Sequence, residues 1–174
     1  MNLKRISPNE YSFNPFEKIG KEWMLISAFD SEKEGNKINT MTASWGGVGV
    51  LWNKNVFFCF IRPQRYTKEF VDNSDTVTLS FFDESKKDAL TLCGRVSGRD
   101  CDKIEKAGLS AYEKDGAVFF KEAKLTVVGK KLFAQNLSKD AFIDPEIIPM
   151  HYPSGDFHMM YVCEICDMYF SNEE

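Results

Sequence analysis

The chain has 174 residues, of which 43% are apolar and 28% are charged. This balance suits a single folded domain over residues 1–174 and excludes intrinsic disorder. The formal net charge of −4 excludes general nucleic-acid binding, because no long basic stripe is available to displace counterions from phosphates. No apolar run approaches the ~20 residues that a membrane-spanning helix needs, and residues 1–11 have no apolar signal-peptide core, so we expect no membrane association.

Strand signals dominate the first part of the chain. Residues 23–30 form an apolar run, and residues 31–39 are polar with a central glycine, which is typical of a loop. The segment 40–52 resumes a strand pattern, although three glycines interrupt it. Glycines inside a strand mark a bend or the close approach of another backbone or a ligand. A hairpin turn at 53–55 then leads to a buried strand over 56–62.

The middle of the chain alternates short helices with strands. Side-chain oxygens that cap a helix start, and glycines that stop a helix end, set the expected boundaries. In chain order we predict a helix over 67–74 capped by Thr67, a strand over 75–82, a helix over 83–94 stopped by Gly94, a short strand within 95–100, and a helix over 101–109 capped by Asp100 and stopped by Gly108.

The last third returns to strands. We predict two or three strands over 117–137 with a turn near Gly129, a helical turn within 138–149, a turn at 152–156 and a closing strand over 157–170. Many strands with short helices between them indicate a mainly β fold, a barrel or sandwich with peripheral helices.

The cysteines predict neither a disulfide nor a metal site. There are five, an odd number, and they are scattered along the chain, so we expect reduced thiols and a cytoplasmic setting. Cys163 and Cys166 have the CxxC spacing, but they lie in a predicted strand, where their side chains should point to opposite faces. The chain has no second cysteine pair to complete a zinc site.

The stretch NTMTASWGG, residues 39–47, combines small hydroxyls, an indole and two glycines. In a strand, one face would carry Thr40, Thr42 and Ser44, and the other Met41, Ala43 and Trp45. One edge could offer hydroxyls and backbone groups to a polar ring, and the small residues would let a flat ring approach the backbone. The alternative is an ordinary edge strand whose threonines face water.

The segment IRPQRYTKEF, residues 61–70, places arginines at a predicted helix start. Arg62 ends a strand, and Arg65, Tyr66 and Thr67 follow the proline turn. A helix N-terminus offers unpaired N–H groups, and the guanidinium fork matches phosphate geometry, so together they predict an anion site. The alternative is that Thr67 only caps the helix while both arginines lie in solvent.

Two further residues could contact a ligand. Lys103 lies in the first turn of a predicted helix, where a cation is unfavourable unless an anion is near. It could instead be a solvated lysine paired with Asp100 or Glu105. His158 follows the turn at 152–156 and could donate a hydrogen bond or move a proton, or serve only a structural role. The sequence contains no recognisable nucleophile or phosphate-loop motif.

Four blocks of the chain resemble, in order, the flavin reductase-like proteins of the FMN-binding split-barrel class. They are NTMTASWGGVGVLW, FIRPQRYTKEF, GRVSGRDCDKIEKAGL and GDFHMMYVCEI. The opening PFEKIGKEWMLISA is similar to the first strand of that family, so the resemblance spans roughly residues 15–166. The last block departs from the family pattern, which reads closer to GDHTLFVGEV, by one extra residue between Asp156 and His158.

The resemblance implies a split β-barrel of Greek-key type that forms a homodimer and holds FMN without a covalent bond near the subunit interface. Carried over by position, Asn39, Thr40, Met41, Thr42, Ala43, Ser44 and Trp45 would border the ring and ribityl chain. Arg62, Arg65, Tyr66 and Thr67 would lie about the phosphate, and Lys103 would be a further anion contact. His158 would lie near the flavin and the nicotinamide.

Three hypotheses about function follow from the resemblance. The first is an NAD(P)H-dependent flavin reductase that uses NADH or NADPH as its electron donor. The second is a flavoredoxin-like FMN electron carrier that a partner redox protein reduces. The third is a barrel without redox activity that binds another phosphorylated ligand or none. In the first two, the flavin carries the electron chemistry and the protein supplies position and electrostatics.

Overall fold

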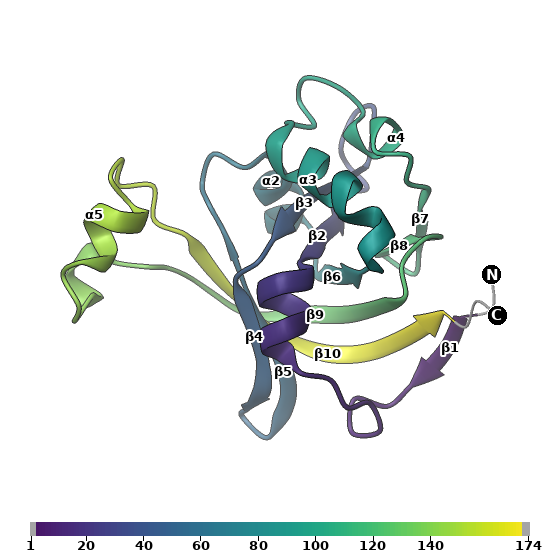
Figure 1. The fold of residues 1–174 in the computed structure, drawn as a ribbon, viewed down its shortest axis with the longest axis horizontal. Coiled ribbons are helices and arrows are strands. Elements are labelled where there is room, and N and C mark those ends of the chain that lie inside the picture. Colours follow the sequence, from purple (N-terminus) through teal and green to yellow (C-terminus); the bar gives the residue numbers. More distant parts are fainter. Residues whose placement is uncertain (1–2, 172–174) are drawn as a thin grey trace.

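One antiparallel sheet of eight strands organises the computed structural model, which describes residues 3–171. Along the sheet the strands follow the order β3-β2-β6-β9-β10-β5-β4, and β1 pairs with the far end of β10. The sheet curls around its own core (Figure 1). Its strands are β1 (Leu3–Ile6), β2 (Met24–Phe29), β3 (Ile38–Ala43), β4 (Gly46–Leu51), β5 (Lys54–Ile61), β6 (Thr76–Phe81), β9 (Leu125–Asn136) and β10 (Met159–Ser171).

The two ends of the strand order meet at one corner. β3 and β4 are the terminal strands of the path, yet only Ser44 and Trp45 separate them in the chain. Gly46 begins β4, and a Cβ there would lie 2.8 Å from the Phe58 carbonyl oxygen and 3.1 Å from the Met24 side chain. The glycine therefore lets β4 start close against its neighbours, and it shapes the corner between β3 and β4.

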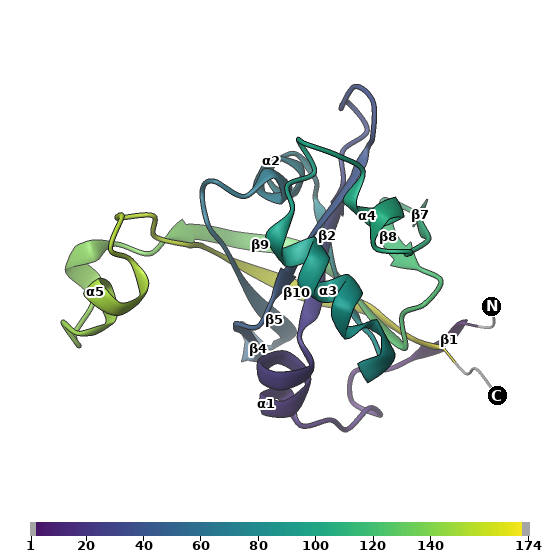
Figure 2. The same cartoon turned by 45° about the horizontal axis from the view of Figure 1, so that its top comes forward.

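Short helices and a hairpin cover one side of the sheet (Figures 1 and 2). Ile26 of β2 belongs to the larger buried cluster, whereas its neighbour Leu25 packs in a second cluster with Leu90, Ile104 and Val118. Successive strand residues point to opposite faces, so the sheet has a core on each face. The elements on the Leu25 side are η2 (Glu84–Lys86), α3 (Lys87–Arg95), α4 (Lys103–Lys106), β7 (Ala111–Lys114) and β8 (Ala117–Phe120). On the other face, α2 (Tyr66–Asn73) buries Phe70 and Val71 in the larger cluster.

A long excursion between β9 and β10 projects away from the sheet (Figures 1 and 2). This segment, residues 137–158, contains η3 (Lys139–Ala141) and α5 (Ile147–His151). The helical turn predicted within 138–149 is therefore confirmed. We call it the arm. The turn predicted at 152–156 is present in it, with Gly155 at φ +70°. The arm ends at His158, directly before β10 begins at Met159.

Several predicted boundaries are wrong. The strand pattern over 40–52 is two strands, and the hairpin turns at Trp52 and Asn53, whose φ values are 52° and 57°, rather than over 53–55. Residues 95–100 contain no strand, because Arg95 ends α3 and a turn follows it. Asp102, not Asp100, caps α4, and Gly94 lies within α3 rather than stopping it.

Some short elements were not predicted. Residues 15–22, in the stretch that resembles the family's first strand, are helical, with α1 (Pro15–Glu17) followed by a π-helical turn, η1 (Lys18–Glu22). The Asn14 side chain caps α1 by accepting from the Phe16 N–H. Neither β1 nor β7 was predicted. Both are four-residue strands with exposed positions, so they lack the apolar run on which strand prediction depends.

Gly129 marks a close packing contact rather than the predicted turn. β9 runs through it without interruption, paired with β6 and β10. A Cβ at Gly129 would lie 2.2 Å from Phe57 Cε1 and 2.9 Å from the Cys163 Cβ. The fully buried Phe57 ring therefore occupies the space of the missing side chain.

We expect Gly129→Ala to lower the free energy of unfolding by about 1–3 kcal/mol, because the added methyl overpacks a buried aromatic ring. Chemical denaturation monitored by circular dichroism measures this change. Gly49→Ala is the matched control, since it adds the same methyl to strand β4 with no heavy atom within 4 Å. Equal stabilities for the two variants would contradict the packing role.

Candidate functional site

A cavity of about 160 Å³ opens beside the corner between β3 and β4, and we call it the corner cavity. Five consecutive residues, Met41 to Trp45, line it. Because alternate side chains of a strand point to opposite faces, a cavity that touches all five approaches the strand from its edge. Its other lining residues are Phe60, Arg62, Arg65 and His158.

The edge of β3 that faces away from β2 has no strand partner within residues 3–171. Backbone N–H and C=O groups along such an edge are free to bind a ligand. The threonine hydroxyls, in contrast, are used inside the protein. Thr40 is fully buried, and its hydroxyl donates to the Ile26 carbonyl and accepts from the Ser27 hydroxyl. The Thr42 hydroxyl donates to the Leu90 carbonyl in α3.

The alternative that the threonines face water is wrong for Thr40, which is fully buried and bonded within the sheet. Thr42 is half-buried and lines the corner cavity, and its hydroxyl already donates to α3. The predicted contacts through backbone groups and small residues at this edge remain, since Ala43 and Ser44 line the corner cavity.

Arg62 links the corner cavity to the arm. Its guanidinium forms an ion pair with Asp156 and donates to the His151 carbonyl at 2.9 Å. The charged end also lies 5.2 Å from the centre of the Tyr152 ring. Hydrogen bonds from Gln64 and Arg62 hold the pKa of Asp156 below its usual value, so the carboxylate offsets the Arg62 charge. Arg62 thus shares its charge between the cavity and the arm.

Arg65 and Lys103 converge on the C-terminal end of α3. The Arg65 guanidinium donates to the Gly94 carbonyl at 2.6 Å. The Lys103 ammonium donates to the carbonyls of Cys93, at 3.1 Å, and Val96, at 3.2 Å. The last carbonyls of a helix carry partial negative charge and favour cations. Burial and the nearby Arg62 charge lower the pKa of Arg65 below its usual value.

Lys103 is buried, which contradicts the alternative of a solvated lysine paired with Asp100 or Glu105. Only 3% of its surface is exposed, and burial lowers its pKa to about 8. Two of its three N–H donors have carbonyl partners, so one donor remains for another group. Lys103 lines a second cavity of about 150 Å³, which Asn39 and Tyr66 also line.

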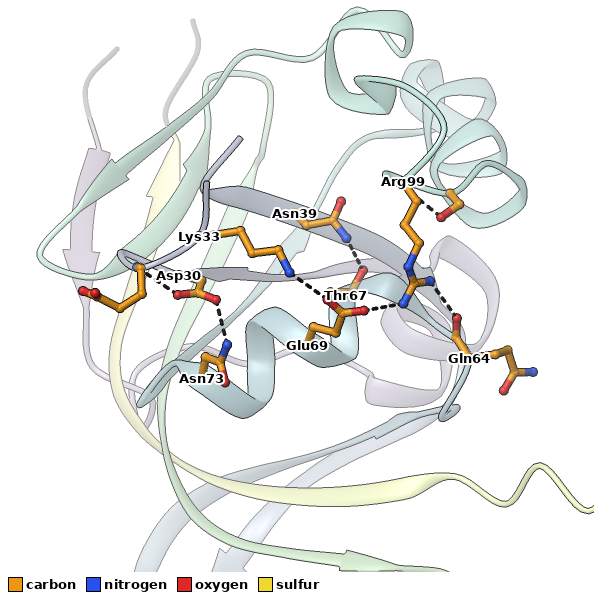
Figure 3. A network of polar contacts seen from close by, with 10 residues as sticks. Asp30, Lys33, Asn39, Gln64, Thr67, Glu69, Asn73 and Arg99 are labelled. Carbon is orange, nitrogen blue, oxygen red and sulfur yellow. Dashed lines mark hydrogen bonds and ion pairs between the residues drawn. The ribbon is translucent and has the colours of Figure 1, made fainter. Parts of the chain in front are cut away.

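The Thr67 side chain does not cap α2. The N-cap residue is Arg65, and Thr67 is buried one position inside the helix. Its hydroxyl accepts from the Asn39 side-chain amide at 3.0 Å, which ties α2 to β3 (Figure 3). A Cβ at Gly98 would lie 2.3 Å from the Asn39 Oδ1. Only glycine fits beside this amide, so Asn39 is held between Thr67 and Gly98.

Tyr66 lies between two cations that share one carboxylate. Arg99 and Lys33 approach its ring at 4.5 and 5.0 Å from the centroid, and both form ion pairs with Glu69 (Figure 3). Hydrogen bonds from Lys33 and Arg99 hold the pKa of Glu69 below its usual value. This network positions Tyr66 beside the second cavity.

Aromatic rings surround His158 where the arm meets the corner cavity. Trp45 is 42% exposed, and its ring lies 5.2 Å from the His158 ring and 5.3 Å from the His151 ring. His158 is buried, and its Nδ1 lies 2.9 Å from the Tyr152 hydroxyl. Burial is the main cause that lowers the pKa of His158 to about 4, and the Arg62 charge adds to it. The imidazole is therefore neutral at pH 7.

The structure brings most of the predicted residues to two adjacent cavities and leaves Thr40 and Thr67 as internal supports. It also adds residues that sequence reasoning missed, chiefly Phe60, His151, Tyr152 and Asp156. Tyr152 and Asp156 are the first and last residues of the turn at 152–156, which comes just before His158. The turn signal is therefore the feature that could have pointed to them.

The two cavities offer guanidinium, ammonium and amide donors together with flat aromatic walls. This combination suits a planar ligand that carries an anionic group. Among residues 3–171, no cluster of three or more His, Cys, Asp or Glu side chains could hold a metal ion. Cys163 is buried and Cys166 is exposed, as the strand geometry predicts, and both are free thiols. No helix in that range is long and apolar enough to cross a membrane.

No protein-family model and no curated protein match this chain, but solved structures do. An FMN-binding domain of a flavin reductase-like enzyme from Shewanella baltica aligns with a TM-score of 0.66 at 13% identity, covering 97% of this chain and 77% of that one. Flavoredoxin from Methanosarcina acetivorans gives 0.65 at 19% identity, with 87% and 69% covered. An FMN-binding protein from Thermus thermophilus gives 0.65 at 18%, with 86% and 71% covered.

These similarities show the fold. The chain has the architecture of the flavin reductase-like and flavoredoxin structures, which confirms the predicted mainly β split barrel with peripheral helices. The resemblance that the four sequence blocks suggested is thus confirmed for the architecture of the chain.

The depressed pKa of His158 makes a prediction about stability. In the unfolded chain the imidazole takes a proton as the pH falls below about 6.5, whereas the folded protein keeps it neutral until about pH 4. The contribution of the neutral His158 ring to the free energy of unfolding is therefore complete above about pH 6.5 and is lost as the pH falls towards 4. We expect the stability difference between wild type and His158→Gln to shrink by up to about 3 kcal/mol over this range.

Chemical denaturation of both proteins at several pH values measures this difference, and subtracting the two curves removes the carboxylates that titrate in the same range. A difference that stays constant from pH 7 to pH 4 would show that His158 titrates normally in the folded protein.

Proposed function

We propose that this protein is an FMN-binding oxidoreductase, an NAD(P)H-dependent flavin reductase that transfers hydride from a nicotinamide to flavin. The observation that carries the proposal is the corner cavity, where the unpaired edge of β3 and the two residues that follow it lie beside Arg62, Arg65 and a neutral His158. The same fold occurs in proteins whose names state that they bind FMN.

The residues present fit FMN. The free edge of β3 supplies backbone donors and acceptors for the polar rim of a ring, and Ala43 leaves room beside it. We propose that Asn39 to Trp45 border the isoalloxazine and ribityl chain. Arg62, Arg65, Tyr66, Thr67 and Lys103 surround the phosphate, which suits the spare donors on Arg65 and Lys103. Thr67 contributes by holding Asn39.

FMN, when bound, supplies hydride and electron transfer. The protein's own residues would bind and orient the FMN and shield it from water. Arg65 and Lys103 hold positive charge near the cavities, where it stabilises an anionic ligand. His158 stays neutral and offers a hydrogen bond without adding charge. The part-exposed Trp45 leaves the cavity open on one side, which suits the entry of NADH or NADPH.

An electron carrier is the second candidate function. Two flavoredoxins, from Methanosarcina acetivorans and Desulfovibrio vulgaris, align with TM-scores of 0.65. The flavin reductase-like enzyme aligns with a TM-score of 0.66, so the scores do not separate the two kinds of protein. In this alternative a partner redox protein, rather than a nicotinamide, delivers the electrons. The third hypothesis, a barrel without redox activity, requires a site that does not bind FMN.

We also propose a homodimer, because the arm presents apolar side chains that its own chain does not cover. Ile143 is 99% exposed, and Met150 is 70% exposed. The corner cavity of about 160 Å³ is smaller than the ~300–1,000 Å³ of pockets that enclose a drug-sized ligand, so a second copy has room to cover the ligand. Sedimentation equilibrium tests this, and a monomer at micromolar concentration would contradict it. The five free cysteines suit a cytoplasmic location.

The experiment that separates the functions begins with the visible spectrum of the purified protein. We expect bound or bindable FMN, and rapid bleaching of the flavin absorbance on anaerobic addition of NADH or NADPH. Bleaching by a protein donor but not by either nicotinamide would favour the electron carrier. A colourless protein whose melting temperature is unchanged by FMN would rule out both redox functions.

Arg65→Ala tests the phosphate side of the proposed site. We expect it to weaken FMN binding by about 2 kcal/mol or more, roughly thirtyfold in Kd, because a partly buried charge partner is lost. Fluorescence quenching of FMN measures the affinity. Arg95→Ala is the matched control. Arg95 is the last residue of α3, the helix whose end Arg65 contacts, but it is exposed and lines neither cavity. Equal affinities in the two variants would remove Arg65 from the phosphate site.

A further inference from the structure

Tyr152 and His158 form a buried pair whose role the proposed function does not assign. The Tyr152 hydroxyl lies 2.9 Å from His158 Nδ1, and the two rings meet edge to face at 5.5 Å. Only 4% of Tyr152 and 7% of His158 are exposed. The tyrosine ring is held by Phe142 and Phe157, whose centroids lie 5.7 and 4.9 Å away. The pair is therefore a fixed feature of the arm.

The hydrogen bond has one direction that satisfies both groups. A neutral imidazole carries one proton, on Nδ1 or on Nε2. If Nδ1 donated to the phenol oxygen, the buried phenol proton would have no acceptor, because the Tyr152 hydroxyl has no second partner within residues 3–171. An unsatisfied buried donor costs about 1–3 kcal/mol. Burial also raises the pKa of Tyr152, which keeps its proton in place.

The second ring nitrogen of His158 opens onto the corner cavity. His158 lines that cavity, and its Nε2 has no protein partner in the described range. Over the same range, Ser80 Oγ is the only side-chain nitrogen or oxygen that is both sealed and unpaired. Nε2 is therefore accessible rather than sealed, and the His158 ring lines the corner cavity together with Trp45, Arg62 and Phe60.

We propose that Tyr152 is a positioning residue. Its hydroxyl donates to His158 Nδ1 and thereby fixes the neutral imidazole as an Nε2–H donor aimed into the corner cavity. The group that this donor recognises is an uncharged acceptor, a carbonyl oxygen or ring nitrogen of a heteroaromatic ligand, while Arg65 and Lys103 take the anionic group. The identification of that ligand as a flavin rests on the proposed function, but the direction of the hydrogen bond does not.

The first test uses the protein without added flavin. The chain has only two histidines, so long-range ¹H–¹⁵N spectra of the ¹⁵N-labelled full chain resolve both rings, and His151→Gln assigns them. At pH 7 we expect His158 to show a protonated Nε2 and an unprotonated, hydrogen-bonded Nδ1. In Tyr152→Phe, which keeps the ring, the Nδ1 resonance should move to the position of a nitrogen without a hydrogen bond.

Tyr161→Phe is the matched control, because Tyr161 is equally buried and its hydroxyl donates to Asp72 instead. It should leave the His158 resonances unchanged. A proton on Nδ1 in the wild type, or an Nδ1 resonance that does not move in Tyr152→Phe, would overturn the proposal. Neither result depends on whether the protein binds a flavin.

The second test adds FMN as the probe. We expect saturating FMN to shift the His158 Nε2–H resonance, and Tyr152→Phe to weaken FMN binding about fivefold, as for one neutral hydrogen bond. Binding of FMN without any shift at Nε2 would overturn the donor role. If FMN does not bind at all, the proposed function fails while the flavin-free spectra still decide the role of Tyr152.

Discussion

The C-terminal end of α3 is the feature on which the candidate site depends. Its last carbonyls would be unpaired in an isolated helix, and here they hold Arg65 and Lys103. The partial negative charge of the helix end stabilises two cations that would otherwise be costly to bury. Both side chains keep donors to spare. The helix end thus places positive charge next to the cavities before any ligand arrives.

The arm completes what the barrel corner begins. Arg62 on the barrel side is held by Asp156 and by the His151 carbonyl from the arm, and the arm also brings Tyr152 against His158. The site is therefore assembled from two parts of the fold, and its geometry depends on how the arm lies. The same segment exposes Ile143 and Met150, so the surface that suits a second subunit is continuous in the chain with the residues that shape the cavity.

The chemistry of the cavities explains why no nucleophile motif or paired acid and base stands out. Besides the Thr42 and Ser44 hydroxyls, the polar groups of the corner cavity are two guanidinium groups, a neutral imidazole and backbone groups of a free strand edge. Such groups bind and orient a cofactor that carries its own reactivity. The fold alone would not establish this, because one fold hosts several functions. The side chains at the corner of β3 and β4 are what distinguish a cofactor site here.

The sequence by itself determined the mainly β architecture and most helices and strands, because periodicity and glycines are local signals. The resemblance of the four sequence blocks, rather than any local signal, grouped Met41 to Trp45 with Arg62, Arg65 and His158, which line one cavity. Only the tertiary structure decided what each polar group contacts. Thr67 has the residue type of a cap but is buried against Asn39. Lys103 binds carbonyls ten and seven residues away. The Phe57 ring fills the space beside Gly129 that a side chain would occupy. Such pairings join different elements, and no local pattern encodes a partner that only packing brings near.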